Sequence, residues 1–172
     1  MVVAKLRRCW RRGASGRDIL VVDIGWVSDG TEGMAMTPKR ASDLVAAARS
    51  RIENLTVDQV AEELDRGEVV LVDLREQNER QLHGVIPGAI HAPRGMLEFW
   101  ADPTIPLHRP EFDPDRRVIL HCAAGGRSAL AADTLKEMGY GNVAHLQGGF
   151  EAWKAAGRLV LPAEGSPEAP AH

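Results

Sequence analysis

The sequence predicts an α/β fold in which a mostly parallel sheet is covered by helices on both faces. Two runs, Val69–Asp73 and Arg117–His121, are short, β-branched and largely apolar, which is typical of strands buried on both sides. Segments with helical spacing lie between such runs, and strands that alternate with helices are joined by right-handed crossovers in a parallel sheet. The 172 residues have room for one domain of ordinary size and two tails.

The first predicted helix spans residues 37–52. Thr37 can cap it, and Pro38 suits the first helical position because the N–H that proline lacks has no partner there. The second predicted helix begins at Thr56, where Gln59 three residues later completes a capping box, and it ends before the next glycine. Both helices therefore precede the first buried strand.

The remaining elements are predicted from helical spacing, β-branched runs and the glycines and prolines between them. In chain order they are a helix at 76–82, a turn into a short strand at 83–90, one or two helical turns at 94–100, a helix at 128–138, a strand at 142–146 and a helix at 148–156. The predicted organisation is a basic, poorly ordered extension at 1–36, a domain at 37–157 and a disordered tail at 158–172, which is rich in proline, alanine and glutamate.

The composition is that of a soluble globular protein, with 44% apolar and 26% charged residues. The net charge of -3 does not indicate a nucleic-acid binder, and no apolar run is long enough to span a bilayer. The first 18 residues carry six lysines and arginines against one aspartate. A solvated basic end is the favoured interpretation, and contact with nucleic acid or anionic lipid is the alternative.

The chain has two cysteines, Cys9 and Cys122, which do not form the framework of a disulfide-rich protein. Asp18 and Asp23 bracket the only apolar run near the start, so a secretory signal is not indicated and a cytoplasmic location is expected. The histidines show no metal-ligand spacing with each other or with cysteine, so no metal site is expected.

The strongest chemical signal lies in residues 121–128, His-Cys-Ala-Ala-Gly-Gly-Arg-Ser, which follow the second buried strand and begin a helix. In open α/β sheets, ligands bind beyond the carboxyl ends of the strands. A helix N-terminus adds free N–H donors and the positive end of a dipole, which favours the thiolate form of a cysteine placed there. Cys122 is therefore the candidate catalytic nucleophile.

The residues that follow this cysteine are expected to hold an anion. The two glycines let the backbone bend with several N–H groups pointing inward, and the two alanines keep the bowl open. The arginine can face an anion such as thiosulfate. The candidate substrate-binding residues are Ala123, Ala124, Gly125, Gly126, Arg127 and Ser128.

Asp73 and Arg75 lie at the carboxyl end of the first buried strand, close to this loop. They are candidates for polarising a substrate, but an internal ion pair that fixes the loop is the favoured interpretation, because ion-pair networks also gather at such edges. Side chains alternate along a strand, so His121 is not expected to act directly as a base for Cys122.

Four segments resemble the rhodanese-like domain family. They are the loop at 122–128, Val-Leu-Val-Asp-Leu-Arg-Glu at 70–76, Gly-Val-Ile-Pro-Gly-Ala at 84–89 and the Gly-Gly-Phe-Glu-Ala-Trp ending at 148–153. They occur in the family's order and cover roughly residues 56–157. One departure is Val85, where the family often has histidine. The resemblance implies a three-layer sandwich with a five-stranded, mostly parallel central sheet.

The resemblance also implies a thiosulfate sulfurtransferase-type enzyme that works in two steps. Cys122 takes the outer sulfur of a small anionic donor such as thiosulfate, and a thiol or cyanide then accepts that sulfur from the Cys122 persulfide. The inward N–H groups of the loop would stabilise the persulfide anion as an oxyanion hole stabilises oxygen. The same resemblance implies that no metal or organic cofactor takes part, and neither nucleic acid nor a membrane is an expected partner.

Three other interpretations of the cysteine remain open. It can be an ordinary buried thiol, since free cysteine behaves as a small hydrophobe. It can belong to a non-enzymatic module that binds persulfide or sulfide. It can also belong to a cysteine-dependent phosphatase, but those enzymes carry five residues between cysteine and arginine, whereas only four separate Cys122 from Arg127. The shorter loop favours a single sulfur over a phosphate.

Overall fold

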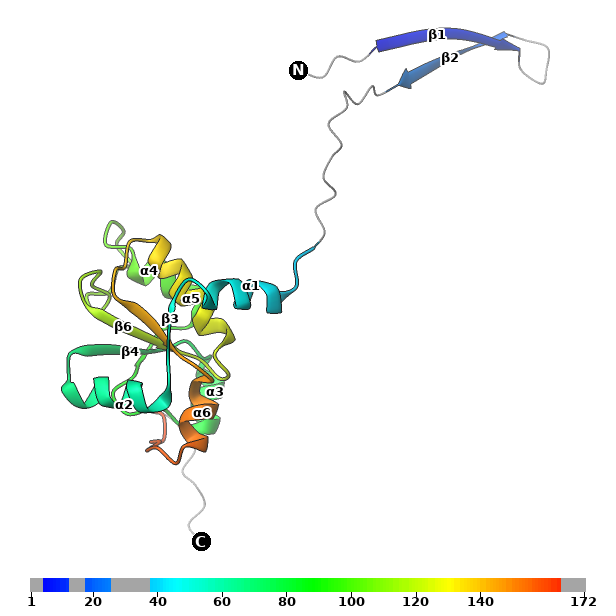
Figure 1. Ribbon diagram of the computed structural model, residues 1–172. Coiled ribbons are helices and arrows are strands. Elements are labelled where there is room, and N and C mark those ends of the chain that lie inside the picture. Colours follow the sequence, from blue (N-terminus) through cyan, green and yellow to red (C-terminus); the bar gives the residue numbers. More distant parts are fainter. Residues whose placement is uncertain (1–4, 13–17, 26–37, 165–172) are drawn as a thin grey trace. The chain divides into compact units, whose positions relative to one another are not determined.

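The computed structural model describes residues 5–12, 18–25 and 38–164 (Figure 1). The chain divides into two compact units, Met1–Pro38 and Lys39–His172. In the first unit, β1 (Lys5–Arg12) and β2 (Asp18–Gly25) pair antiparallel, with Lys5 opposite Gly25. No helix or strand is predicted from the sequence in this extension.

The second unit alternates strands and helices, as the sequence predicts. Its elements are α1 (Ala41–Arg49), β3 (Glu53–Leu55), α2 (Val57–Arg66), β4 (Val69–Asp73), α3 (Gln77–His83), β5 (Ile90–His91), the 3-10 turn η1 (Arg94–Met96), α4 (Leu97–Ala101), β6 (Arg117–His121), α5 (Gly126–Glu137), β7 (Val143–Leu146) and α6 (Gly149–Ala155).

The five strands of this unit form one sheet in the order β3-β7-β6-β4-β5, and every neighbouring pair is parallel. Residues of α1, α4 and α5 pack with one face of the sheet, and residues of α2 and α6 pack with the other (Figure 1). The α/β class and the five-stranded sheet are therefore confirmed. Because all the strands run the same way, β4, β6 and β7 end at a common edge.

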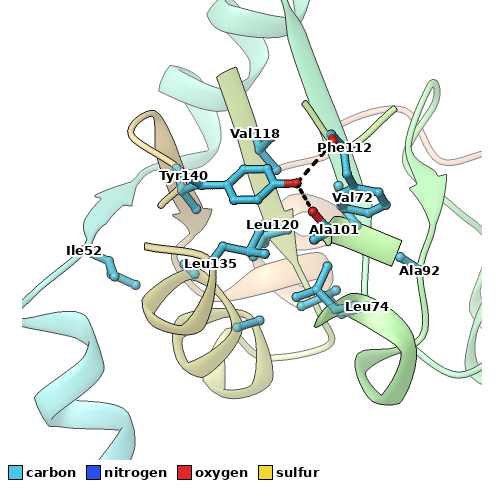
Figure 2. Close-up of a cluster of buried hydrophobic side chains, with 14 of the residues drawn as sticks. Ile52, Val72, Leu74, Ala92, Ala101, Phe112, Val118, Leu120, Leu135 and Tyr140 are labelled. Carbon is cyan, nitrogen blue, oxygen red and sulfur yellow. Dashed lines mark hydrogen bonds between the residues drawn. The ribbon is translucent and has the colours of Figure 1, made fainter. Parts of the chain in front are cut away.

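The core on the α5 face is closed by Tyr140, whose ring lies among aliphatic side chains (Figure 2). Its hydroxyl lies 2.8 Å from the carbonyl oxygen of Ala101 and 3.1 Å from that of Phe112. Burial raises the pKa of Tyr140 to about 12, so the hydroxyl keeps its proton and donates to these carbonyls. The contact links the end of α4 and the loop before β6 to the residues that follow α5.

The helix starts and stops follow local signals wherever those signals are strong. Thr56 and Gln59 form the predicted capping box of α2, which ends at Gly67. The first helix, in contrast, is shorter than predicted and spans Ala41–Arg49 rather than 37–52. Its end is early because the side-chain amide of Asn54 donates to the carbonyl oxygens of Arg49 and Ile52, which turns the chain into β3. Thr37 lies outside the described residues.

Residues 158–164 differ from the disordered tail that the sequence predicts. Leu161 forms an antiparallel bridge with Val85, and the indole N–H of Trp153 donates to the carbonyl of Leu159 at 2.9 Å. Ala163 is buried. This segment therefore packs on the domain, and the rest of the predicted tail, 165–172, lies outside the described residues. Among the helices that the structure describes, none has the length and apolarity needed to cross a membrane.

Candidate active site

Cys122 lies one residue beyond β6, at the carboxyl edge of the sheet and just before α5. The backbone N–H of Gly125 points at its sulfur, with 3.2 Å between nitrogen and Sγ. The cysteine is only 1% exposed, although Ala123 is half-buried and Ala124 is exposed. Of the several inward N–H groups expected, the described hydrogen bonds place that of Gly125 on the sulfur, and the open bowl expected from the two alanines is not found.

The first turn of α6 packs against this loop. The N–H groups of Phe150 and Glu151 donate to the carbonyl oxygens of Cys122 and Ala123, at 2.8 and 3.0 Å. Gly149 makes this approach possible, because a Cβ there would overlap the Cys122 carbonyl oxygen and lie 2.6 Å from that of Ala123. Its φ of 60° is also in the left-handed region that favours glycine. The two glycine-containing turns thus fit against each other backbone to backbone.

A line of buried polar groups leads away from the cysteine on the α5 face. The Ser128 hydroxyl lies 3.7 Å from Cys122 Sγ and 3.1 Å from Nδ1 of His145. Nε2 of His145 lies 2.9 Å from Oδ1 of Asn54. Ser128 and His145 are both fully buried. Burial, reinforced by the positive charge of Arg49, lowers the pKa of His145 to about 4, so its ring is neutral at neutral pH.

Arg127 does not stand free at the start of α5. Its guanidinium makes two hydrogen bonds to the carboxylate of Glu79 on α3, at 2.7 and 2.6 Å. This pairing raises the pKa of Arg127 and lowers that of Glu79. Both side chains remain partly exposed, at 37% and 28%. The candidate anion-binding charge is therefore balanced by a carboxylate that the sequence analysis did not single out.

Asp73 and Arg75 form a buried ion pair at the end of β4. Arg75 donates to both carboxylate oxygens of Asp73 at 3.0 and 2.7 Å, and also to the carbonyl of Gly84 at 2.8 Å. Its guanidinium lies 3.8 Å from the centre of the Phe150 ring. Burial disfavours the charge of Asp73, but the hydrogen bonds from Arg75 and the positive charge around the carboxylate together outweigh burial and lower the pKa of the carboxyl. The geometry fits the loop-fixing interpretation, because the pair joins β4 to the start of α6.

His121 faces the opposite side of the sheet from Cys122. Its ring stacks on Phe150, with 6.5 Å between the ring centres, and lies 3.8 Å from Asp73 Oδ2. Burial lowers the pKa of His121 to about 4. The alternation predicted along the strand is thus present, and the histidine on the face of Cys122 is His145 instead.

A cleft of about 270 Å³ opens beside the loop. Its lining includes Ala123, the two carboxylates Glu79 and Glu151, and Lys154, whereas Cys122 is not part of it. Its charges are mixed in sign, so the positive excess expected of a site for a small dianion is absent there. Among the described residues, no three histidine, cysteine, aspartate or glutamate side chains gather as a metal site would require.

The sequence of this domain matches a known protein family. Residues 56–156 match the model of the rhodanese-like domain. The chain belongs to the rhodanese-like domain family. The resemblance drawn from the four sequence segments is thereby confirmed, and Cys122 with its glycine loop occupies the segment of the rhodanese domain that joins β6 to α5.

The relatives of this rhodanese domain include sulfurtransferases. A sulfurtransferase of Allochromatium vinosum is 36% identical over 59% of this chain and 86% of its own length. Thiosulfate sulfurtransferase GlpE of Pseudoalteromonas translucida is 34% identical over 60% of this chain and 90% of its own length. A solved protein of unknown function from Rhodopseudomonas palustris, described as a possible tyrosine phosphatase, is 43% identical with a TM-score of 0.68, covering 74% of this chain and 99% of that one.

The structure brings some predicted site residues together and adds others. Gly125 and Ser128 both contact the sulfur of Cys122. His145, Asn54 and Glu79 were missed, because each joins the site through a contact between residues far apart in the sequence. The one available signal was the alternation along β7, which places His145 on the face opposite Ala144 and Leu146.

We expect Gly149→Ala to destabilise the domain by on the order of 3 kcal/mol or more, since the new methyl group overlaps carbonyl oxygens of the cysteine loop. Urea unfolding measures the loss. Gly67→Ala is the matched control, because Gly67 has a similar φ of 78° with nothing within 4 Å of an added Cβ. It should cost only about 1 kcal/mol. Equal costs would show that backbone strain alone, and not the fit between the two turns, explains Gly149.

We also expect the free energy of unfolding to fall as the pH is lowered from about 6.5 towards 4. His121 and His145 each have a pKa of about 4 in the folded protein against 6.5 when free, so the unfolded chain binds more protons throughout this interval. The full loss approaches about 3 kcal/mol per residue. Urea unfolding at a series of pH values measures the slope.

The control for this slope is a matched pair of variants. His145→Phe should remove about half of the slope that the two histidines contribute, whatever it does to stability at neutral pH, while the carboxylates with lowered pKa values keep their own share. His83→Gln changes an exposed side chain and should leave the slope unaltered. A slope that survives His145→Phe in full would contradict the contribution of this histidine.

Proposed function

We propose that this rhodanese domain is a sulfurtransferase that carries sulfane sulfur as a persulfide on Cys122. The observation that carries the proposal is the N–H of Gly125 aimed at the sulfur from the turn that begins α5, 3.2 Å away. A donor at this distance stabilises a negative charge on sulfur, and the start of the 12-residue α5 adds the positive end of its dipole. The two sulfurtransferase relatives support the same chemistry.

The proposed transfer has two steps, each of which breaks one S–S bond and forms one new bond to the transferred sulfur. The Cys122 thiolate attacks the outer sulfur of thiosulfate, the S–S bond of the donor breaks, and sulfite leaves with the electron pair. Cys122 then carries a terminal S⁻. A thiol or cyanide attacks this outer sulfur, and Cys122 leaves as thiolate. No electrons remain to be supplied by a cofactor, since each displacement is balanced by its leaving group.

Access to the sulfur limits what the donor can be. Because Cys122 is 1% exposed, a donor has to present one protruding sulfur atom at the mouth of the loop, beside the small side chain of Ala123. Thiosulfate and persulfides have such an atom. The same restriction disfavours a phosphate ester, whose phosphorus is surrounded by four oxygens.

A cysteine phosphatase is the second candidate, favoured by the description of the Rhodopseudomonas palustris relative. The four-residue spacing between Cys122 and Arg127 is one short of the spacing in such enzymes, and Glu79 already occupies the guanidinium that would bind the phosphate. A non-enzymatic persulfide module is the third. The three candidates are distinguished by whether sulfur is gained, whether it is discharged and whether an aryl phosphate is hydrolysed.

We expect thiosulfate to add one sulfur atom to the protein, and cyanide or a thiol to remove it. Intact mass spectrometry before and after the acceptor is added measures both steps. Cys9→Ser should behave like the unaltered chain, whereas Cys122→Ser should gain nothing. A sulfur that is gained but not discharged indicates a binding module. No gain, combined with hydrolysis of an aryl phosphate, indicates the phosphatase and contradicts the proposal.

We expect Arg127 and Glu79 to affect the use of thiosulfate in opposite directions. Arg127→Ala removes the positive charge at the loop and should raise KM for thiosulfate about tenfold, whereas Glu79→Gln frees the guanidinium and should lower it. Steady-state sulfur transfer to cyanide measures both constants. Because the pair is partly exposed, either change should alter the free energy of unfolding by less than about 1 kcal/mol.

The outcome that separates the two roles of Arg127 is the effect of Glu79→Gln. If this variant raises KM as Arg127→Ala does, the ion pair serves to hold α3 against α5. Arg127 would then have no part in binding the donor.

A further inference from the structure

The hydrogen bonds that link Cys122 through Ser128 and His145 to Asn54 run in one donor-to-acceptor direction. Asn54, at the end far from the cysteine, sets this direction. The Asn54 amide nitrogen lies 2.9 Å from two backbone carbonyl oxygens, those of Arg49 and Ile52. Only a donor fits between two carbonyls, so Oδ1 is the atom that faces Nε2 of His145 at 2.9 Å. Since Oδ1 is an acceptor, Nε2 of His145 carries the proton.

The other ring nitrogen of His145 is consequently an acceptor. The ring is fully buried, and the groups that face it are Asn54 of β3, Ser128 of α5 and the charge of Arg49 at the end of α1. No carboxylate is among these neighbours, whereas the cation of Arg49 opposes a second proton on the ring. A neutral ring with its proton on Nε2 leaves Nδ1 bare.

Ser128 then has only one way to share its single proton. Its hydroxyl donates to Nδ1 across 3.1 Å, and its lone pairs face Sγ of Cys122 at 3.7 Å. In this arrangement Ser128 accepts a hydrogen bond from the thiol and has no proton to offer the thiolate. The two groups that touch the sulfur act in opposite senses, because the Gly125 N–H favours the thiolate.

We propose that His145 is a positioning residue that holds the proton of Ser128 away from Cys122 and so biases the resting cysteine toward the neutral thiol. This bias acts on Cys122 before it carries sulfur. It ends once a persulfide forms, because the inner sulfur then has no proton to give. The proton lost on ionisation passes to water and not to His145. The importance of this bias for catalysis rests on the proposed function, whereas the hydrogen-bond direction does not.

The first test changes His145 and Ser128, singly and in combination, and measures the thiolate of Cys122 directly. All variants carry Cys9→Ser, and the ultraviolet absorbance of the thiolate is followed with pH against the same protein carrying Cys122→Ser. His145→Phe keeps a ring of similar size but removes the acceptor, so Ser128 can donate to the sulfur. The ratio of thiolate to thiol at neutral pH should rise about tenfold, the value of one hydrogen bond to a charged group.

The effect of Ser128→Ala on the thiolate fraction of Cys122 distinguishes this role of His145 from a purely structural one. With His145 present, this substitution should not lower the thiolate fraction, because no donor to the thiolate is removed. In the His145→Phe background it should abolish the tenfold gain. A lower thiolate fraction in the single Ser128→Ala variant, or in His145→Phe, would overturn the proposal, and the latter result would instead indicate that His145 takes up the thiol proton through Ser128.

A second measurement uses the chain without any change at these positions, in case His145→Phe does not fold. The nitrogen-15 chemical shifts of the His145 ring distinguish its two neutral forms, and the form with the proton on Nε2 is expected across neutral pH. A proton on Nδ1 would contradict the proposal. If sulfur is never transferred while the ring and thiolate results hold, the proposed function fails and the inference about His145 stands.

Discussion

The fit of one backbone turn against another is the constraint on which the site depends. The first turn of α6 donates two N–H groups to the carbonyl oxygens of Cys122 and Ala123, and Gly149 lacks the side chain that would keep the two segments apart. With its carbonyls held on this side, the loop directs the Gly125 N–H inward to the sulfur. The position of the sulfur thus follows from contacts between backbones, while the buried pair of Asp73 and Arg75 steadies the same α6 from the β4 side.

Charge around the site is more balanced than the loop sequence alone indicates. Arg127 is neutralised by Glu79, and the cleft beside Ala123 carries both acids and a lysine. Any binding of an anion at Arg127 must therefore compete with a carboxylate already in place, so affinity for a small donor reflects a difference between two ionic contacts. A donor bound by additional contacts, such as a persulfide on a larger molecule, would be less sensitive to this competition.

The parts of the fold predicted from the sequence are those with strong local signals. The capping box of α2, the buried runs of β4 and β6 and the glycine turn after Cys122 each act within a few residues. The three-residue β3 carries too little pattern to detect, and it exists because it pairs with β7 about 90 residues later. His145, Asn54 and Glu79 were missed for the same reason, and the burial of Cys122 depends on packing that no local pattern encodes.

The segment after α6 bears on where the domain can be cut. The family match ends at residue 156, but Leu161 pairs with Val85, which directly follows the Gly84 carbonyl that Arg75 binds. The carbonyl of Leu159 accepts the hydrogen bond of the Trp153 indole. A fragment that ended at residue 156 would leave the indole N–H of Trp153 without its acceptor and the backbone of Val85 without its bridge partner. A recombinant piece intended to represent the isolated domain should accordingly extend at least to Ala163, the last buried residue of this segment.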